Sequence, residues 1–438
     1  MAQFRTDQKK LDGPSLVTRY EVGMLSDRLT PTGTLTDAFG RLRMSTPHTL
    51  FDSSHRFADN GLWATSNTAT GTYAFVANQS TVDLTVDTTA DAEIIRETVK
   101  VFSYQPGKSL LIMSTFAMNP PKTNLRQRVG YFGAQNGVFL ENDGTTNYLV
   151  LRSYTTGSIV ETRVNQTNWN SDKFDGAGYS GQGSAPEHTV GLNVSKTNIL
   201  WFDIEWLGVG DVRCGFVVDG KLITAHTFHN DNRNTAPYMT TATLPLRYEI
   251  KNTGTTASSS TLKQICSTVI SEGGYELYGA QQAVQTPIGV PVDLPSPTGT
   301  YYPVISLRLK ASPDRLDAVV ILTALSILGI TNNAYYNWQV RTNATTSGGT
   351  WVSAGSNSAV EYKIDGGSIT EGRVLASGFT AATNQSSAPI DILKQALFKF
   401  QLERNGLTST PYELTLCAST QTAGADIYAS MDWEEITR

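Results

Sequence analysis

Two acidic side chains on one predicted strand have the clearest chemical potential in this sequence. Asp203 and Glu205 lie two residues apart in the apolar segment 199–206, so a strand would place both on the same face. Paired carboxylates supply the acid and the base that cleave glycosidic bonds. The same spacing is also the ordinary polar face of a half-buried strand, and the sequence supports both interpretations.

Two histidines, His226 and His229, have the spacing at which a helix could hold a metal ion. On a strand, residues three apart point to opposite faces, and this segment continues a predicted hairpin strand. We therefore expect no metal there. Asn230, Asn232 and Asn234 have the spacing of a calcium loop, but the carboxylates and the glycine of such a loop are missing, which favours a solvated turn.

Two glycine-rich stretches have the pattern of phosphate-binding loops but lack the context. Gly176–Gly181 matches G-x-G-x-x-G without a strand before it or a helix after it, so we predict a loop. Gly215–Leu222 has leucine where a phosphate loop needs Ser or Thr, and its middle is typical of a strand. The sequence shows no G-x-S-x-G and no evident Ser-His-Asp or Cys-His arrangement. These observations predict that the chain is not an enzyme and has no cofactor or metal.

Composition narrows the class of protein further. The chain has 438 residues, a formal net charge of −5 and 17% charged residues. The length predicts two domains, and the slightly acidic balance gives no broad basic field for nucleic acid. Three distant cysteines, Cys214, Cys266 and Cys417, predict no disulfide framework. No apolar run is long enough for a spanning helix, and residues 1–10 lack the apolar core of a secretory signal, so we expect no membrane insertion.

The secondary-structure pattern is that of an all-β protein. Threonine and glycine are frequent, and short apolar runs alternate with turn residues from about residue 62 onwards. Asp219-Gly220 stands between two apolar runs and predicts a tight type I′ hairpin, because both central residues need a positive φ. The spacing of these runs, without helical patterns between them, favours β-sandwiches of the jelly-roll or lectin-like kind.

The chain divides into four predicted parts. Residues 1–60 have turn-rich sequence with sparse apolar residues, which predicts an extended anchoring arm lying against its own domain or a neighbouring subunit. Residues 61–278 predict the lectin-like sandwich, residues 279–300 are rich in proline and glycine and predict a linker, and residues 301–438 predict a second sandwich. The side chains expected to anchor the arm are Leu35, Phe39, Arg41, Leu42, Arg43, Leu50 and Phe51.

One part of the arm resembles a known signature. Asp37–Arg43 (DAFGRLR) followed by Leu50–Ser53 (LFDS) is similar to the N-terminal signature of a family of tailed-bacteriophage virion proteins. Further similar segments follow in the same order as far as about residue 275, and they are Asn136–Phe139, Tyr148–Ser153, Trp169–Asp172, Trp206–Gly210, Asp219–Lys221 and Leu244–Ile250. The resemblance implies a structural part of the particle and a central domain similar to concanavalin A-like or laminin G-like sandwiches. It supplies no catalytic residues.

These observations predict a non-enzymatic virion component, assembled in the host cytoplasm and anchored by its arm in a peripheral tail, fiber, baseplate, collar or spike. The expected partners are other virion proteins and further copies of the chain, in a homotrimer or another symmetric oligomer, with no nucleic acid. Two alternatives are a capsid decoration protein and a module that binds host surface glycans through loops such as 168–186 and 229–240. A third is a glycan depolymerase that uses Asp203 and Glu205.

Overall fold

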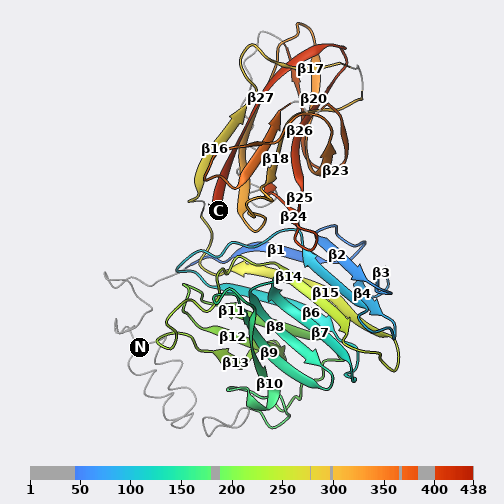
Figure 1. Cartoon of the computed structure of the whole chain (residues 1–438), viewed down its shortest axis with the longest axis vertical. Coiled ribbons are helices and arrows are strands. Elements are labelled where there is room, and N and C mark those ends of the chain that lie inside the picture. The colour runs from blue at the N-terminus through green and yellow to red at the C-terminus, as the bar shows by residue number, and fades with distance from the viewer. Residues whose placement is uncertain are drawn as a thin grey trace, which may run out of the picture. The chain divides into compact units, whose positions relative to one another are not determined.

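The computed structural model describes residues 45–178, 188–276, 278–295, 299–364, 367–382 and 400–437 (Figure 1). Within these ranges the chain is built of antiparallel β-strands, with one short 3-10 turn, η1 (Gln166–Asn168). This confirms the all-β prediction. The described residues include no helix of the length and apolar character needed to cross a membrane.

The first sandwich consists of two antiparallel sheets. In spatial order, the eight-stranded sheet contains β13 (Lys221–Phe228), β12 (Val212–Val218), β11 (Asn198–Ile204), β6 (Leu110–Ala117), β15 (Ser260–Ser271), β4 (Thr81–Val86) and β3 (Thr72–Val76), and β1 (His48–Ser54) also pairs with β15. The seven-stranded sheet contains β10 (Val160–Asn165), β9 (Thr146–Ser153), β8 (Gly137–Asp143), β7 (Leu125–Phe132), β14 (Leu246–Asn252), β5 (Glu93–Thr98) and β2 (Trp63–Thr68).

Alternation along the strands builds the core between these two sheets. On β14, Tyr248 and Ile250 are buried in the core, while Arg247, Glu249 and Lys251 occupy the alternate positions. A strand points successive side chains to opposite faces, so one face of each sheet packs on the other and the opposite face is polar. The seven-stranded sheet therefore has a charged outer face.

The Asp-Gly hairpin forms as the sequence predicts. Asp219 and Gly220 connect β12 and β13 with φ values of 50° and 79°. Gly215–Leu222, considered above as a phosphate loop, lies in these two strands and their turn.

The last residues predicted for the arm form a strand of the first sandwich. His48–Ser54 forms β1, which is hydrogen-bonded to β15 within the eight-stranded sheet. Leu50 and Phe51 are only 7% exposed and belong to the core of the first sandwich. Of the two surfaces considered for the arm, these two side chains use the chain's own domain, because a β-bulge at Leu50 lets two successive side chains face the core. The other expected anchors lie outside the described residues, namely Leu35, Phe39, Arg41, Leu42 and Arg43.

The second sandwich has its own two sheets and its own core. The four-stranded sheet contains β16 (Ala280–Gln285), β27 (Ala425–Thr437) and β17 (Val292–Leu294), with β19 (Val319–Gly329) also paired to β27. The six-stranded sheet contains β21 (Val352–Ser353), β22 (Val360–Ile364), β18 (Tyr302–Leu309), β26 (Glu413–Thr420), β20 (Tyr335–Thr346) and β23 (Ile369–Ala381). A small hairpin pairs β24 (Arg404–Asn405) with β25 (Thr410–Pro411).

The linker prediction for residues 279–300 is wrong. β16 and β17 come from this stretch and pair with opposite ends of the long strand β27. Proline is tolerated on an edge strand or beside one, because only one side of such a strand is hydrogen-bonded. Proline and glycine here therefore mark turns within the second sandwich, and its first strand begins at residue 280.

Phe51 tests whether β1 is an integral part of the first sandwich. Its ring packs 5.0 Å from Phe102 and 6.0 Å from Trp63, measured between ring centroids. We expect Phe51→Ala to lower the free energy of unfolding by about 3–5 kcal/mol, measured by urea titration, because the cavity can close only in part. The matched control is Phe57→Ala, since Phe57 is 87% exposed and should cost less than about 0.5 kcal/mol. Equal effects of the two substitutions would contradict the assignment.

Candidate functional site

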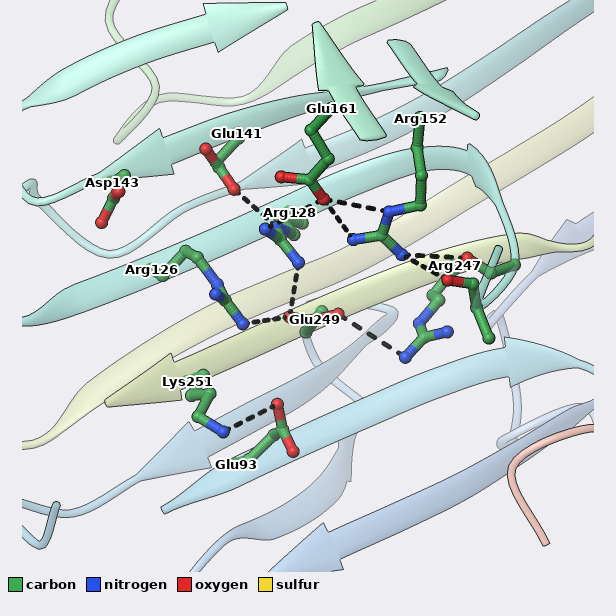
Figure 2. A network of polar contacts seen from close by, with 12 residues as sticks. Glu93, Arg126, Arg128, Glu141, Asp143, Arg152, Glu161, Arg247, Glu249 and Lys251 are labelled. Atoms are coloured by element: carbon green, nitrogen blue, oxygen red, sulfur yellow. Dashed lines mark hydrogen bonds and ion pairs between the residues drawn. The ribbon is translucent and has the colours of Figure 1, made fainter. Parts of the chain in front are cut away.

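The outer face of the seven-stranded sheet carries a network of ion pairs (Figure 2). Glu249 on β14 accepts hydrogen bonds from Arg126 at 2.9 Å and from Arg128 at 3.4 Å. Arg128 also donates to Glu141 on β8 at 2.6 Å, and Arg247 lies 3.6 Å from Glu249. Three arginines on two neighbouring strands therefore surround one carboxylate.

The same network continues onto β9 and β10. Arg152 donates to Glu161 at 2.7 Å and to the backbone carbonyl of Gly133 at 3.1 Å. Arg163 pairs with Asp143 at 2.8 Å and also with Glu141. Each carboxylate labelled in Figure 2 has a cationic partner.

Burial makes this pairing energetically important. Arg128, Glu141 and Glu249 are all more than nine-tenths buried, although they lie on the outer face. Burial alone favours the neutral form of Glu249, but Arg247, Arg128 and Arg126 together hold its pKa below the ordinary value. Removing one member would leave an uncompensated buried charge.

The aromatic rings of this face are covered by the arginines. The guanidinium carbons of Arg128 and Arg152 each lie 5.1 Å from the ring centroid of Phe139, and that of Arg163 lies 4.2 Å from the ring of Tyr148. Such stacking uses ring faces that could otherwise contact a sugar. We therefore assign this face a structural role and look for a binding site elsewhere on the sandwich.

The structure brings the two predicted carboxylates, Asp203 and Glu205, into one hollow of about 400 Å³, which we call the carboxylate hollow. Asp203 lies on β11 directly opposite Arg213 of β12 and is ion-paired with it. Burial raises the pKa of Asp203, the Arg213 guanidinium opposes the rise, and the Glu272 carboxylate adds to it. The third carboxylate of the hollow, Asp211, was not identified from the sequence.

The two histidines do not share a site. His226 is buried, its ring accepts a hydrogen bond from the backbone N–H of Asn170, and burial together with His229 lowers its pKa to about 4. His229 is partly exposed and lies 2.7 Å from Asp211, measured from Nδ1 to Oδ2. The strand thus separates the two histidines as its alternation predicts, and the neighbour of His229 is Asp211, which precedes β12.

A second hollow, of about 470 Å³, is lined by polar residues among those that the structure describes. We call it the amide hollow, and its wall consists of residues 145–147, 165–167, 173 and 175. Asn142 donates to Asn147 at 2.8 Å, Asn147 donates to Gln166 at 2.9 Å, and Gln166 donates to the backbone carbonyl of Lys173 at 2.9 Å. This chain fixes the orientation of each amide. Lys173 and Asp175 lie in the loop 168–186 that the sequence proposed for glycan contact, whereas Asn147 and Gln166 were not identified.

The β8–β9 turn and the end of β10 position the amide hollow. Gly144 takes a φ of 63° in that turn, which sets Asn142 and Asn147 opposite each other across the hairpin. Asn165 caps η1 by accepting from the backbone N–H of Thr167 at 3.1 Å. The glycine motif begins just beyond, where Gly176 has a φ of 91°, and its last three residues, 179–181, lie outside the described residues.

A larger hollow, of about 790 Å³, has aromatic side chains in its wall, and we call it the aromatic hollow. Tyr104 and Trp206 pack edge to face, with ring centroids 5.7 Å apart, and Lys108 lies in both this wall and that of the carboxylate hollow. The Tyr104 hydroxyl accepts a hydrogen bond from the backbone N–H of Leu207 at 3.2 Å. The two rings therefore hold the β11–β12 loop in place.

Comparison with known proteins finds only distant similarity, and only to solved structures. No protein-family model and no curated sequence matches this chain. Among solved structures, it is similar to peanut lectin, with 10% identity, a TM-score of 0.29 and coverage of 52% of this chain and 98% of the lectin. It is also similar to a Bacillus licheniformis β-glucanase, with 12% identity, a TM-score of 0.31 and coverage of 50% and 96%. A carbohydrate esterase from the Shiga toxin-encoding bacteriophage phi24B matches with 10% identity, a TM-score of 0.28 and coverage of 52% and 100%.

The expectation that the chain is not an enzyme has to be corrected. Sandwiches to which it is similar include a β-glucanase and a carbohydrate esterase, so a lectin-like architecture does not exclude catalysis. The expectation rested on the absence of recognisable motifs, and catalytic groups that come from separate strands leave no such motif in the sequence. Likeness at this level of identity shows the fold alone.

Glu249 tests whether the charged face is structural. We expect Glu249→Gln to lower the free energy of unfolding by about 3–5 kcal/mol, because three guanidinium groups lose their shared counter-charge. The matched control is Glu93→Gln on β5, whose partner Lys251 is 3.7 Å away and partly exposed, and which should cost about 0–1 kcal/mol. Urea titration of the two variants beside the unchanged chain measures both values.

The pH dependence follows from the lowered pKa of Glu249. Its ionised form stabilises the fold above the unfolded pKa of about 4.3, and this contribution is lost as the pH falls through the lower folded value. The unchanged chain should therefore lose more stability than Glu249→Gln between about pH 5 and pH 3. Parallel stability curves over that range would contradict the proposed pairing.

Proposed function

We propose that the chain binds a neutral carbohydrate through the amide hollow of its first sandwich. The observation that carries this proposal is a hollow whose described lining residues are Thr, Asn, Gln, Lys and Asp. A ligand for such a wall must present many groups that both donate and accept hydrogen bonds. The hydroxyl groups of a sugar have this property, and an apolar ligand would leave the wall unsatisfied.

The fixed orientation of the amides supports recognition of a particular sugar. Asn147 and Gln166 are each held by a hydrogen bond from a neighbouring side chain, so less conformational entropy is lost on binding. Asp175 accepts a hydrogen bond from the backbone N–H of Ala177 at 2.9 Å through one oxygen, and among the described residues its second oxygen has no hydrogen bond and can face a ligand. Lys173 and Asp175 carry opposite charges, so the wall favours a neutral glycan over a charged one.

Among the described residues, the wall includes no aromatic side chain on which a sugar ring could stack. Hydrogen bonds alone contribute little net free energy, because the sugar exchanges them with water. We therefore expect binding by one copy of the hollow with a dissociation constant of about 1 mM, and stronger attachment when several copies act together.

Asp175→Asn tests the site. The substitution keeps the shape of the side chain and the oxygen that accepts from Ala177, but it removes the charge. We expect a glycan identified on an array of neutral oligosaccharides to bind the variant about tenfold more weakly in a titration followed by NMR. Asp219→Asn is the matched control, since Asp219 lies in the β12–β13 turn and should leave binding unchanged.

Two outcomes would contradict this assignment. Absence of binding to any neutral oligosaccharide at millimolar concentration would remove the glycan proposal. Binding that Asp175→Asn leaves unchanged but Trp206→Ala weakens would move the site to the aromatic hollow.

We also propose that the chain is a structural component of a tailed-phage virion, in a peripheral tail, baseplate, collar or spike. The supporting observation is the resemblance of Asp37–Arg43 and Leu50–Ser53 to the signature of such proteins. A glycan-binding sandwich on the outside of a particle would serve attachment to a host surface. The same resemblance leaves room for a capsid decoration protein.

Cryo-electron microscopy of purified particles tests the virion proposal. We expect copies of the chain as a homotrimer or another symmetric oligomer at the tail or collar. Copies on the icosahedral shell would make it a decoration protein, and absence from the particle would contradict both assignments.

A further inference from the structure

The ends of β12 and β13 bring a histidine and two aspartates together. Val212, the first residue of β12, pairs with Phe228, the last residue of β13. Asp211 comes just before Val212 and His229 just after Phe228, so the two lie side by side at this end of the hairpin. Residues opposite each other in an antiparallel pair have neighbouring side chains, and here His229 Nδ1 lies 2.7 Å from Asp211 Oδ2. The turn that follows adds Asp231 to the same group.

This group has the dimensions of a metal site. One ligand atom from each of Asp211, His229 and Asp231 lies within 4.8 Å of the others. Nitrogen and oxygen ligands bind zinc at about 2.0–2.2 Å, so two ligands of one ion are separated by at most about 4.4 Å. In a tetrahedral site two such ligands lie about 3.4 Å apart, so the His229–Asp211 pair at 2.7 Å would open and the more distant ligand atoms would approach one another when the ion binds.

We propose that Asp211, His229 and Asp231 bind a divalent transition-metal ion. One imidazole and two carboxylates suit ions such as Zn²⁺ and Mn²⁺, whereas Ca²⁺ prefers oxygen ligands alone and Cu⁺ prefers sulfur. Three protein ligands leave at least one coordination position for water or for a ligand. This proposal does not depend on glycan binding in the amide hollow, which uses other residues.

The surrounding backbone holds the ligands in place. The N–H of Asn230 donates to the second oxygen of Asp211 at 3.1 Å, and the Asn230 side chain donates to the carbonyl of Gly210 at 3.0 Å. Asn230 thereby ties the turn after β13 to the start of β12. The side chains of Asp211 and His229 remain 32% and 40% exposed, so an ion can reach them from solvent.

Two further observations point to a ligand beside Asp211. The carboxylate hollow, of about 400 Å³, includes Asp211 in its wall together with Asp203 and Glu205, and this gives room for coordinated water. Tyr238 is 6% exposed, and its hydroxyl has no hydrogen-bond partner among the described residues. Burial raises the pKa of Tyr238, and Tyr104, Cys214, Asp211 and Glu205 add to the rise in that order. A buried hydroxyl without a partner is satisfied when an ordered water lies within its reach.

Titration of the full chain with zinc after chelator treatment tests the site. We expect one ion per chain by isothermal titration calorimetry, with a zinc-dependent rise in the melting temperature. His229→Ala and Asp231→Asn should each weaken zinc binding at least tenfold and remove the rise in melting temperature. Asp219→Asn, an exposed aspartate in the turn at the other end of the same hairpin, should bind zinc like the unchanged chain.

The proposal is overturned if zinc shows no saturable binding below about 1 mM, or if both variants bind it as tightly as the unchanged chain. Circular dichroism confirms that each variant is folded, and two independent variants protect the test against the failure of one. Anomalous diffraction at the zinc edge then locates the ion. A peak between Asp211 and His229 supports the assignment, and a peak elsewhere contradicts it.

Discussion

The buried carboxylate of Glu249 is the constraint on which the first sandwich depends. A charge in this position is tolerated only because Arg126, Arg128 and Arg247 compensate it from two neighbouring strands. That compensation requires β7 and β14 to pair in one register, since a slip by one residue would turn Arg128 towards the core. The ion pairs thus specify strand register as well as contributing to stability.

This constraint also decides where the chain is able to recognise other molecules. The arginines of the outer face satisfy its carboxylates and cover its aromatic rings, so the broad face of the sheet has little left to offer a ligand (Figure 2). Side chains with spare hydrogen-bonding capacity lie instead at the ends of strands and in turns. The amide hollow and the group around Asp211 and His229 both lie in such places.

Much of the fold was predictable because its signals are local. Asp219-Gly220 requires a tight turn, and the alternation on β14 requires one buried and one polar face, whatever the rest of the chain does. The boundaries were harder. β1 and β16 are single strands that join sheets whose other strands come from distant parts of the sequence, so their short patterns resembled an arm and a linker.

The sequence by itself determined the all-β class and the Asp219-Gly220 hairpin, and it singled out Asp203 and Glu205, although β11 ends at Ile204 and only Asp203 lies on that strand. Only the tertiary structure decided which residues meet across strands. An unbroken register from the Asp219-Gly220 turn would set Asp211 opposite Phe228, but an irregularity beside Gly215 shifts the pairing by one residue and sets it opposite His229. Such a bulge depends on how the whole sheet twists and packs, so the residues of the hairpin alone do not reveal it.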